Sequence, residues 1–219
     1  MQINEDIIEE MQRLLFFAPP RKVKSCIFFL PGRSQYGSHL LEYWCHYSGI
    51  RFSDVLLATF TPRNLEWYPL PRNAEDQDDS VVGIKKSIGL IESLITSVEE
   101  NFNLPRRKIG IVGYSAGGVM ANYVGTNSNK EFAGVVCHSG AYLEPEKMQK
   151  CKFGKMPFVL SHSLNDSVFD WYERYLPMKE AFKTNKYDVS HIEDRNHNHA
   201  ISKYAIMESA YILEERLQS

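Results

Sequence analysis

The segment that decides the fold is Lys108-Ile-Gly-Ile-Val-Gly-Tyr-Ser-Ala-Gly-Gly-Val119. Its first residues form an apolar run typical of a strand buried on both faces, and a segment of helical period follows the serine. Between the two lies Gly113-Tyr114-Ser115-Ala116-Gly117, which has the pattern G-x-S-x-G. This pattern is informative when it stands between a strand and a helix, as it does here. The segment therefore predicts a sharp strand-to-helix turn with Ser115 at its tip.

The residues around Ser115 suit a nucleophile. A serine at the tip of such a turn has a strained backbone, so the positions two residues away must lack side chains. Gly113 and Gly117 meet this need, and the helix that follows directs its N-terminal amides toward a reacting carbonyl. The alternative is a glycine-rich turn in which the serine is incidental. Ser139 also follows an apolar run but lacks the pair of flanking glycines, so we expect it to be structural.

Short apolar runs alternate with segments of helical period along the whole chain. The runs expected to form buried strands are Ser25–Leu30, Asp54–Thr59, Lys108–Val112, Phe132–His138, Met156–Ser161 and Tyr187–Ile192. The segments expected to form helices are Ser38–Tyr47, Ser80–Phe102, Ala116–Gly125, Trp171–Lys183 and Ile201–Leu217. This alternation predicts an α/β fold with a mostly parallel central sheet and helices on both faces. Since no repeat or linker divides the 219 residues, we expect a single domain over residues 1–219.

The charge pattern of the chain excludes several classes of partner. Its 25 Lys and Arg residues nearly balance 27 Asp and Glu residues, which gives a net charge of −2 with the signs interspersed. Surfaces that bind nucleic acids or anionic membranes need a basic excess that is missing here. No apolar run approaches the roughly 20 residues of a membrane-spanning helix. We therefore expect no nucleic-acid partner, no stable membrane insertion, and a small-molecule or protein-borne substrate.

The cysteines and the acidic start of the chain indicate a cytoplasmic protein. Cys26 and Cys137 lie inside predicted buried strands, and neither Cys45 nor Cys151 completes a Cys-x-x-Cys pair. We interpret all four as reduced thiols. Residues 5–10 carry four acidic side chains, the opposite of the basic start of a signal peptide.

A serine nucleophile needs a base, and the base needs an acid that orients it. In a parallel α/β sheet these partners are expected on loops at the carboxyl ends of later strands. Asp166 follows the strand Met156–Ser161 and is the predicted acid, whereas Asp170 stands at the start of the next helix and suits a cap. His199 precedes the last helix and is the predicted base, with His197 as the alternative.

A rival interpretation treats the later histidines as a metal site. His191, His197 and His199 are close in sequence, but no cysteine or carboxylate at ligand spacing completes the set. A metal site would also leave Ser115 and Asp166 unexplained. We therefore expect neither a metal nor another cofactor. The histidines expected to be ordinary surface or loop side chains are His39, His46 and His162.

The oxyanion that forms during acyl transfer needs two main-chain N–H donors. One is expected from Ala116, after the nucleophile, and the other from Arg33 in the turn after the first buried strand. The long irregular loop Thr61–Pro71 carries further candidates, since Trp67, Tyr68 and Leu70 are predicted to contact an acyl chain. Two interpretations remain open for these side chains: they form an apolar wall for substrate, or they pin the loop to the core.

Taken together, these motifs resemble the carboxylesterase/phospholipase family, which includes the acyl-protein thioesterases. The resemblance runs from about Phe16 to Tyr204. The matching residues are Pro31-Gly32, Trp67-Tyr68, Asp79 to Ile84, Gly113 to Gly118, Ser139-Gly140, Asp166 and His199. Family members typically have histidine where Pro31 stands, glutamine where Ala116 stands, glycine where Ser163 stands, and glycine where Asn196 stands. None of these departures removes a reactive group.

The resemblance implies an α/β-hydrolase fold and a serine hydrolase that cleaves esters or thioesters. Ser115, Asp166 and His199 take the places of the family's catalytic residues. Small molecules or acylated proteins are the implied substrates, and a homodimer is left open. Two alternatives remain: a catalytically silent protein of the same fold that binds a ligand or partner, and an esterase for a sugar acetyl ester or a lysophospholipid.

Overall fold

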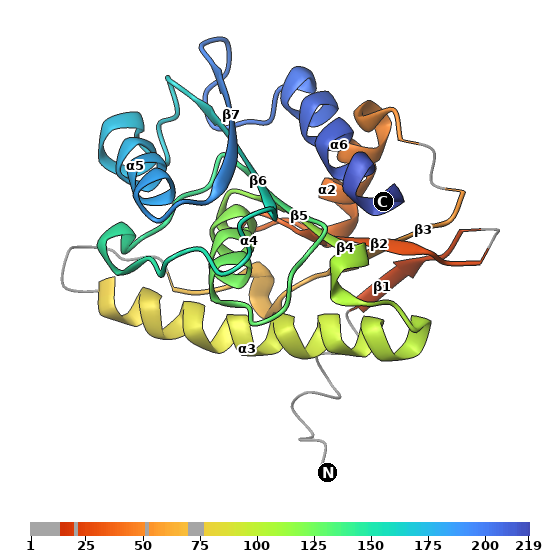
Figure 1. Ribbon diagram of the computed structural model, residues 1–219. Coiled ribbons are helices and arrows are strands. Elements are labelled where there is room, and N and C mark those ends of the chain that lie inside the picture. Colours follow the sequence, from red (N-terminus) through yellow and green to blue (C-terminus); the bar gives the residue numbers. More distant parts are fainter. Residues whose placement is uncertain (1–13, 20–21, 51–52, 70–76) are drawn as a thin grey trace.

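A computed structural model describes residues 14–19, 22–50, 53–69 and 77–219 (Figure 1). The strands are β1 (Leu14–Phe17), β2 (Ser25–Leu30), β3 (Val55–Phe60), β4 (Ile109–Tyr114), β5 (Gly134–His138), β6 (Pro157–Ser163) and β7 (Asp188–Asp194). The α-helices are α2 (Gly37–Ser48), α3 (Gln77–Phe102), α4 (Ala116–Asn127), α5 (Leu176–Thr184) and α6 (Lys203–Gln218). Short 3-10 turns cover Arg63–Leu65, Arg106–Lys108 and Pro145–Lys147, and a π-helical turn covers Trp171–Tyr175.

The strands form one 7-stranded sheet in the order β1-β3-β2-β4-β5-β6-β7. Strands β2 to β7 all run parallel to one another, so the predicted mostly parallel sheet is confirmed. The strand β1 was not predicted, and it pairs antiparallel with β3 at the edge of the sheet. The parallel arrangement places the carboxyl ends of β2, β4, β5, β6 and β7 along the same edge of the sheet.

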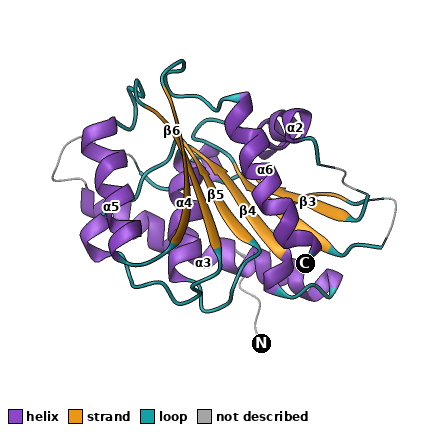
Figure 2. Cartoon of the chain, turned by 45° about the horizontal axis from the view of Figure 1, so that its top comes forward, coloured by secondary structure: helices purple, strands orange, loops and turns teal. Residues whose placement is uncertain are grey.

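Helices cover both faces of the sheet, as expected (Figure 2). Strand β2 shows why, because its side chains alternate between two separate apolar clusters. Cys26 and Phe28 belong to the cluster that contains residues of α3 and α4. Ile27 and Phe29 belong to the other, which contains residues of α2 and α6. A strand that is apolar on both faces therefore requires helices on both faces.

The last strand differs from the prediction of burial on both faces. Within β7 only Ile192 is buried, and every other position is exposed or intermediate. The strand has a neighbour on one side only, β6, so it forms an edge of the sheet. Its polar side chains suit an edge strand, because the backbone of such a strand is paired to another strand on one side only. The predicted helix Trp171–Lys183 also differs, because its first turn is a π-helical turn.

One buried cation joins α3 to the sheet. The guanidinium of Arg106 bonds to Glu92 at 2.6 Å and to Glu99 at 2.7 Å, and it lies 4.9 Å from the centroid of the Phe132 ring. Only 4% of Arg106 is exposed. On the surface, Lys130 reaches the same Glu99 at 3.2 Å. Arg106 stands just before β4, so these ion pairs fix the long helix against the strand that leads to Ser115.

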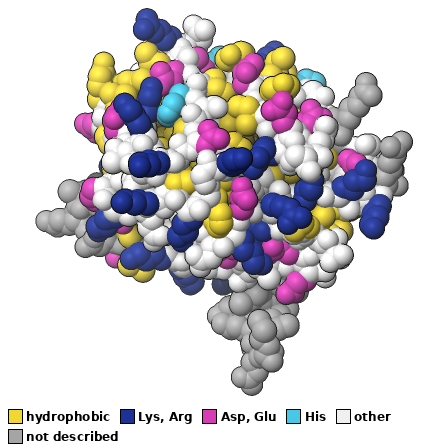
Figure 3. All heavy atoms as spheres, in the orientation of Figure 1, with side chains coloured by type: hydrophobic (Ala, Val, Ile, Leu, Met, Phe, Trp, Pro, Cys, Tyr) yellow, Lys and Arg dark blue, Asp and Glu magenta, His cyan; other side chains and the backbone are white. Residues whose placement is uncertain are grey.

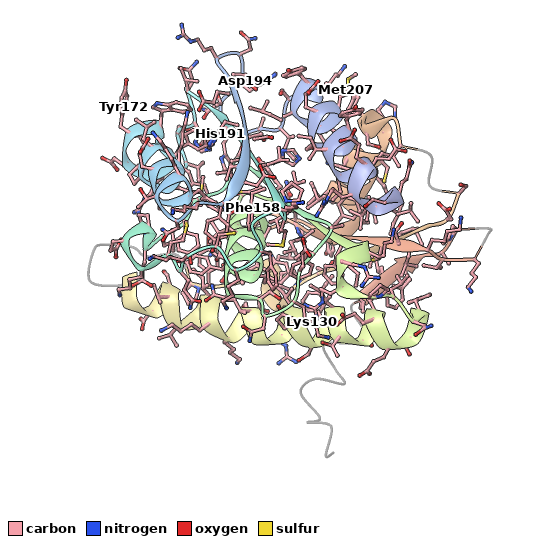
Figure 4. All side chains as sticks on the ribbon, in the orientation of Figure 1. Lys130, Phe158, Tyr172, His191, Asp194 and Met207 are labelled. Atoms are coloured by element: carbon pink, nitrogen blue, oxygen red, sulfur yellow. The ribbon has the colours of Figure 1, made fainter. Side chains whose placement is uncertain are left out.

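The surface of the molecule shows mixed charges. On the face drawn in Figure 3, basic and acidic side chains are interspersed among hydrophobic and uncharged groups. Tyr172, Asp194 and Met207 mark the upper end of the view in Figure 4, toward which β7 runs. Within the described residues, no helix is both long enough and apolar enough to cross a membrane.

Candidate active site

Ser115 occupies the turn between β4 and α4 with a backbone that few side chains adopt. Its φ is 54° and its ψ is −120°. A non-glycine residue at this φ is strained and persists only where the surroundings hold it. The main-chain N–H of Ser115 donates to the carbonyl of His138 at 2.9 Å, and the carbonyl of Ser115 accepts from Val119 at 3.0 Å. The turn is thus held by the neighbouring strand β5 and by the first turn of α4.

The glycines on either side of Ser115 are required by close packing. A Cβ atom added to Gly113 would lie 2.2 Å from the carbonyl oxygen of Gly117. A Cβ atom added to Gly117 would lie 2.0 Å from the carbonyl oxygen of Leu30. Both distances are far inside van der Waals contact, so neither position accepts a side chain without a backbone shift. The G-x-S-x-G pattern therefore follows from the way α4 packs against the ends of β2 and β4.

The three predicted triad residues meet at the carboxyl edge of the sheet. His199 Nε2 lies 2.7 Å from Ser115 Oγ. His199 Nδ1 lies 2.8 Å from Asp166 Oδ2 and 3.0 Å from Asp166 Oδ1. Ser115 follows β4, Asp166 follows β6, and His199 lies between β7 and α6. The imidazole ring thus bridges the hydroxyl and the carboxylate, which is the arrangement that proton transfer from serine requires.

Asp166 is held in place as an anion. Its carboxylate is buried, and Oδ1 accepts hydrogen bonds from the main-chain N–H groups of Val168 at 2.8 Å and Phe169 at 2.9 Å. Burial by itself would raise the pKa of Asp166. The hydrogen bonds from His199, Phe169 and Val168 together outweigh burial and lower that pKa below its usual value. Asp166 is therefore charged at neutral pH and orients the His199 ring with Nδ1–H toward it.

The alternatives to Asp166 and His199 have other structural roles. Asp170 accepts hydrogen bonds from the N–H groups of Tyr172 at 2.7 Å and Glu173 at 3.0 Å, so its prediction as a helix cap is confirmed. The side chain of His197 is exposed, and its carbonyl accepts from the hydroxyl of Ser163. His191 Nδ1 lies 3.1 Å from Tyr175 Oη. Across the described ranges, no three His, Cys, Asp or Glu side chains are grouped as metal ligands.

The two predicted oxyanion donors flank the serine. Ala116 begins α4. Arg33 follows Gly32, and a Cβ atom added to Gly32 would lie 3.3 Å from Ser115 Cβ. The Arg33 side chain is turned toward Glu66 and the carbonyl of Tyr68. Between described residues, neither the main-chain N–H of Ala116 nor that of Arg33 is hydrogen-bonded to a protein acceptor.

The predicted substrate-contacting residues of the Thr61–Pro71 loop are packed into the core. Trp67 and Tyr68 are 4% and 3% exposed. Trp67 Nε1 donates to the carbonyl of Pro31 at 2.8 Å, and the carbonyl of Trp67 accepts from the hydroxyl of Ser87. This packing supports the interpretation that the loop is pinned to the core. Leu70 lies outside the described residues, and contact of any of the three with substrate stays a prediction.

The expectation that His162 is a surface or loop side chain is wrong. It lies in β6 and is 2% exposed. Its Nε2 atom lies 2.8 Å from the carbonyl oxygen of Phe169, and its ring stacks on Tyr175 with centroids 4.6 Å apart. Burial lowers the pKa of His162, so the ring is neutral and donates Nε2–H to that carbonyl. His162 thereby braces the turn that carries Asp166.

Three further contacts hold the segment around His199, and the sequence did not reveal them. Asn198 Oδ1 accepts from the N–H of Ser167 at 2.8 Å. Tyr114 Oη donates to the carbonyl of His199 at 2.9 Å. The Ser139 hydroxyl donates to the carbonyl of Ala200 at 2.9 Å, a contact that agrees with the structural role expected for it. These bonds join the loops after β4, β5, β6 and β7 into one assembly.

Comparison with known proteins shows the family to which the chain belongs. The sequence profile of the family described as Phospholipase/Carboxylesterase matches residues 53–213. The chain belongs to this family. The matched residues include Ser115, Asp166 and His199, and the family agrees with the resemblance seen in the sequence motifs.

Relatives of this phospholipase/carboxylesterase member include an acyl-protein thioesterase 1 homolog 2 from Dictyostelium discoideum, 23% identical over 161 residues that make up 72% of each chain. The fold is similar to that of a phospholipase/carboxylesterase from Dyadobacter fermentans, with a TM-score of 0.78, 16% identity, and coverage of 92% of this chain and 96% of that one. It is also similar to the Bacillus cereus carboxylesterase, with a TM-score of 0.77, 14% identity, and coverage of 96% and 99%. The predicted α/β-hydrolase fold is confirmed.

Proposed function

We propose that this protein is a serine esterase that cleaves carboxylic ester or thioester bonds through an acyl-enzyme on Ser115. The observation that carries the proposal is the bridging position of His199, 2.7 Å from Ser115 Oγ and 2.8 Å from Asp166 Oδ2. A structural serine at the tip of a turn does not need an imidazole beside its hydroxyl. A nucleophilic serine does, because the alcohol must lose its proton as it attacks.

In the proposed reaction, His199 Nε2 accepts the proton of Ser115 while Oγ attacks the carbonyl carbon of the substrate. Asp166 keeps the ring in the tautomer with Nδ1–H and stabilises the imidazolium that forms. The N–H groups of Arg33 and Ala116 bind the oxyanion, each contributing about 3 kcal/mol of transition-state stabilisation. His199 then returns the proton to the departing alcohol or thiol, which leaves the acyl group on Ser115.

The second half of the reaction releases the acid. A water molecule takes the place of the departed group, and His199 removes its proton as it attacks the acyl carbonyl carbon. The bond from that carbon to Ser115 Oγ then breaks, His199 returns the proton to Oγ, and the carboxylic acid leaves. The mechanism needs no cofactor, since each proton passes through His199 and each negative charge falls on the main-chain donors. Small-molecule esters and acylated proteins both fit this chemistry, and membership of the phospholipase/carboxylesterase family supports ester hydrolysis.

The test is reaction with a fluorophosphonate probe, together with hydrolysis of p-nitrophenyl esters from acetate to palmitate. We expect the wild-type chain to be labelled and active, and Ser115→Ala to be neither. The control is Ser93→Ala, because Ser93 is an exposed serine of α3 outside the candidate site. Ser93→Ala should still be labelled and active. Absence of labelling and turnover in the wild type would instead favour a silent ligand-binding protein of the same fold.

A further inference from the structure

A cavity of about 310 Å³ lies beside the candidate active site. The side chains that form it come from α2, from the turn before α2, and from the residues next to Ser115 and His199. They include Gln35, His39, Leu40, Tyr43, Tyr114 and Ile201. Ligand sites in proteins span roughly 300–1,000 Å³, so this cavity has room for a compact group and not for a long chain.

The cavity begins next to the reacting atoms. A Cβ atom added to Gly32 would lie 3.1 Å from Gln35 Oε1 and 3.3 Å from Ser115 Cβ, so both side chains border the same glycine. The ring of Tyr114 lies 5.4 Å from the ring of His199, centroid to centroid. The cavity wall continues into Ile201, two residues after His199. Ala200 and Ile201 directly follow His199 and both line the cavity, so the cavity lies against the loop that carries the histidine, and Gln35 joins it to Gly32.

The side on which the cavity lies decides which part of a substrate reaches it. During acyl transfer the histidine protonates the leaving group, so the leaving oxygen or sulfur must lie within hydrogen-bond reach of His199 Nε2. The carbonyl oxygen points instead toward the N–H groups of Arg33 and Ala116. We propose that this cavity binds the leaving-group alcohol of the substrate, an inference that rests on the proposed esterase function.

The lining of the cavity indicates what kind of alcohol it takes. The hydroxyl of Tyr43 donates to the carbonyl of Ile201 at 3.2 Å, and that of Tyr114 donates to the carbonyl of His199 at 2.9 Å. Both hydroxyls are thus occupied by the protein, and the two rings add to the apolar surface of Leu40 and Ile201, beside the polar side chains of Gln35 and His39. A ring loses less conformational freedom on binding than a flexible chain with the same number of carbons. The cavity therefore favours an alcohol that carries a ring over a straight-chain alcohol of the same size.

The test compares two butyrate esters with primary seven-carbon alcohols, cyclohexylmethyl butyrate and heptyl butyrate. Their acyl groups are identical and their alcohols have similar intrinsic reactivity, so a difference in kcat/KM reports the fit of the leaving group. We expect the wild-type chain to favour the cyclic ester by roughly tenfold, the lower end of what filling a pocket provides. The ratio of kcat/KM for butyrate to kcat/KM for longer acyl groups, measured with one alcohol, supplies the reference.

Substitutions at exposed positions test the role of the cavity without changing the candidate catalytic residues. Tyr43 is 42% exposed, so Tyr43→Ala removes a wall of the cavity without opening the core. It should reduce the preference for the cyclic ester to within about twofold and leave the acyl preference unchanged. Tyr43→Phe retains the ring and should retain the preference. His39→Trp narrows the cavity and should lower kcat/KM for the cyclic ester, whereas His46→Trp, further along α2 on the same exposed side, should not.

The two proposals fail in different ways. Equal kcat/KM values for the two esters in the wild type would overturn the assignment of the cavity, and so would an equal effect of Tyr43→Ala on both. In either case the chain would still hydrolyse esters and react with the fluorophosphonate. If the esterase function itself is wrong, the wild type shows neither hydrolysis nor labelling.

Discussion

Asn198 accepts a hydrogen bond from the main-chain N–H of Ser167, with 2.8 Å between Oδ1 and the nitrogen. Ser167 follows Asp166 directly, and Asn198 precedes His199 directly. The bond therefore joins the loop that carries the candidate acid to the loop that carries the candidate base. It fixes the spacing of two residues that are 33 positions apart in the chain.

Replacing Asn198 by alanine should loosen this spacing. We expect Asn198→Ala to lower kcat/KM for p-nitrophenyl butyrate by about tenfold, while the free energy of unfolding falls by about 1 kcal/mol, the usual contribution of one hydrogen bond. Asn196→Ala, an exposed change two residues earlier, is the control and should be neutral. Unchanged kcat/KM in Asn198→Ala would show that the bond does not position the site.

Alanine at Gly117 should be far more damaging than alanine at another helical glycine. Its Cβ atom would stand 2.0 Å from the carbonyl oxygen of Leu30, which forces α4 away from the end of β2. We expect a loss of more than about 3 kcal/mol of stability, together with loss of fluorophosphonate labelling. Gly89→Ala is the matched control, since a Cβ atom there meets nothing within 4 Å. In the interior of α3 it should raise stability by up to about 1 kcal/mol, measured by urea unfolding.

Arg106 should contribute much more to stability than Lys130, although both bind Glu99. Arg106 is 4% exposed, and Arg106→Leu leaves the carboxylates of Glu92 and Glu99 without their buried partner. We expect a loss of about 3–5 kcal/mol. Lys130 is 60% exposed, and Lys130→Ala should cost less than about 1 kcal/mol. Similar losses in the two variants, measured by urea unfolding, would contradict this difference.

His138 should make the protein sensitive to mild acid. Burial lowers the pKa of His138 to about 3, whereas the unfolded chain titrates near 6.5. Between these values the unfolded state binds one more proton than the folded state at this residue, so stability falls as the pH is lowered. The contribution is about 1.4 kcal/mol per pH unit.

Urea unfolding between about pH 4.5 and 6 checks this dependence. His138→Gln should reduce the slope of unfolding free energy against pH by nearly one proton, even if the substitution lowers stability at every pH. An unchanged slope in His138→Gln would mean that the buried ring is protonated in the folded state.

The regular elements of the sheet were predictable because each parallel strand is apolar on both faces and each helix has a clear period. The exceptions lie at the two edges. Strand β1 has only four residues, and Leu15, Phe16 and Phe17 are 40% or more exposed, so burial left no periodic signal. In β7 the apolar positions Val189 and Ile192 predicted a strand correctly, but sequence alone does not tell a central strand from an edge strand.

Sequence reasoning likewise identified some residues of the candidate site and missed others. Ser115, Asp166 and His199 could be singled out because the proposed chemistry needs three particular side chains in this order along the chain. They lie after β4, after β6 and between β7 and α6, as the sequence predicts. Asn198 and His162 act through hydrogen bonds to main-chain atoms. Almost any polar residue can make such a bond, and its partner depends on how the loops fold together. The position of His162 at the end of an apolar run was the one signal that favoured burial.

The bridge from Ser115 through His199 to Asp166 also has a consequence for folding studies. The three residues come from separate strand–helix units, and parallel pairings between such units form slowly because they join distant parts of the chain. On the proposed mechanism, a partly assembled chain holds Ser115 without the candidate base His199 and therefore does not react with a phosphonate reagent. After dilution from urea, the labelled fraction at each time would therefore report the fraction of native molecules. The rate at which it increases would report the rate of the last step of assembly.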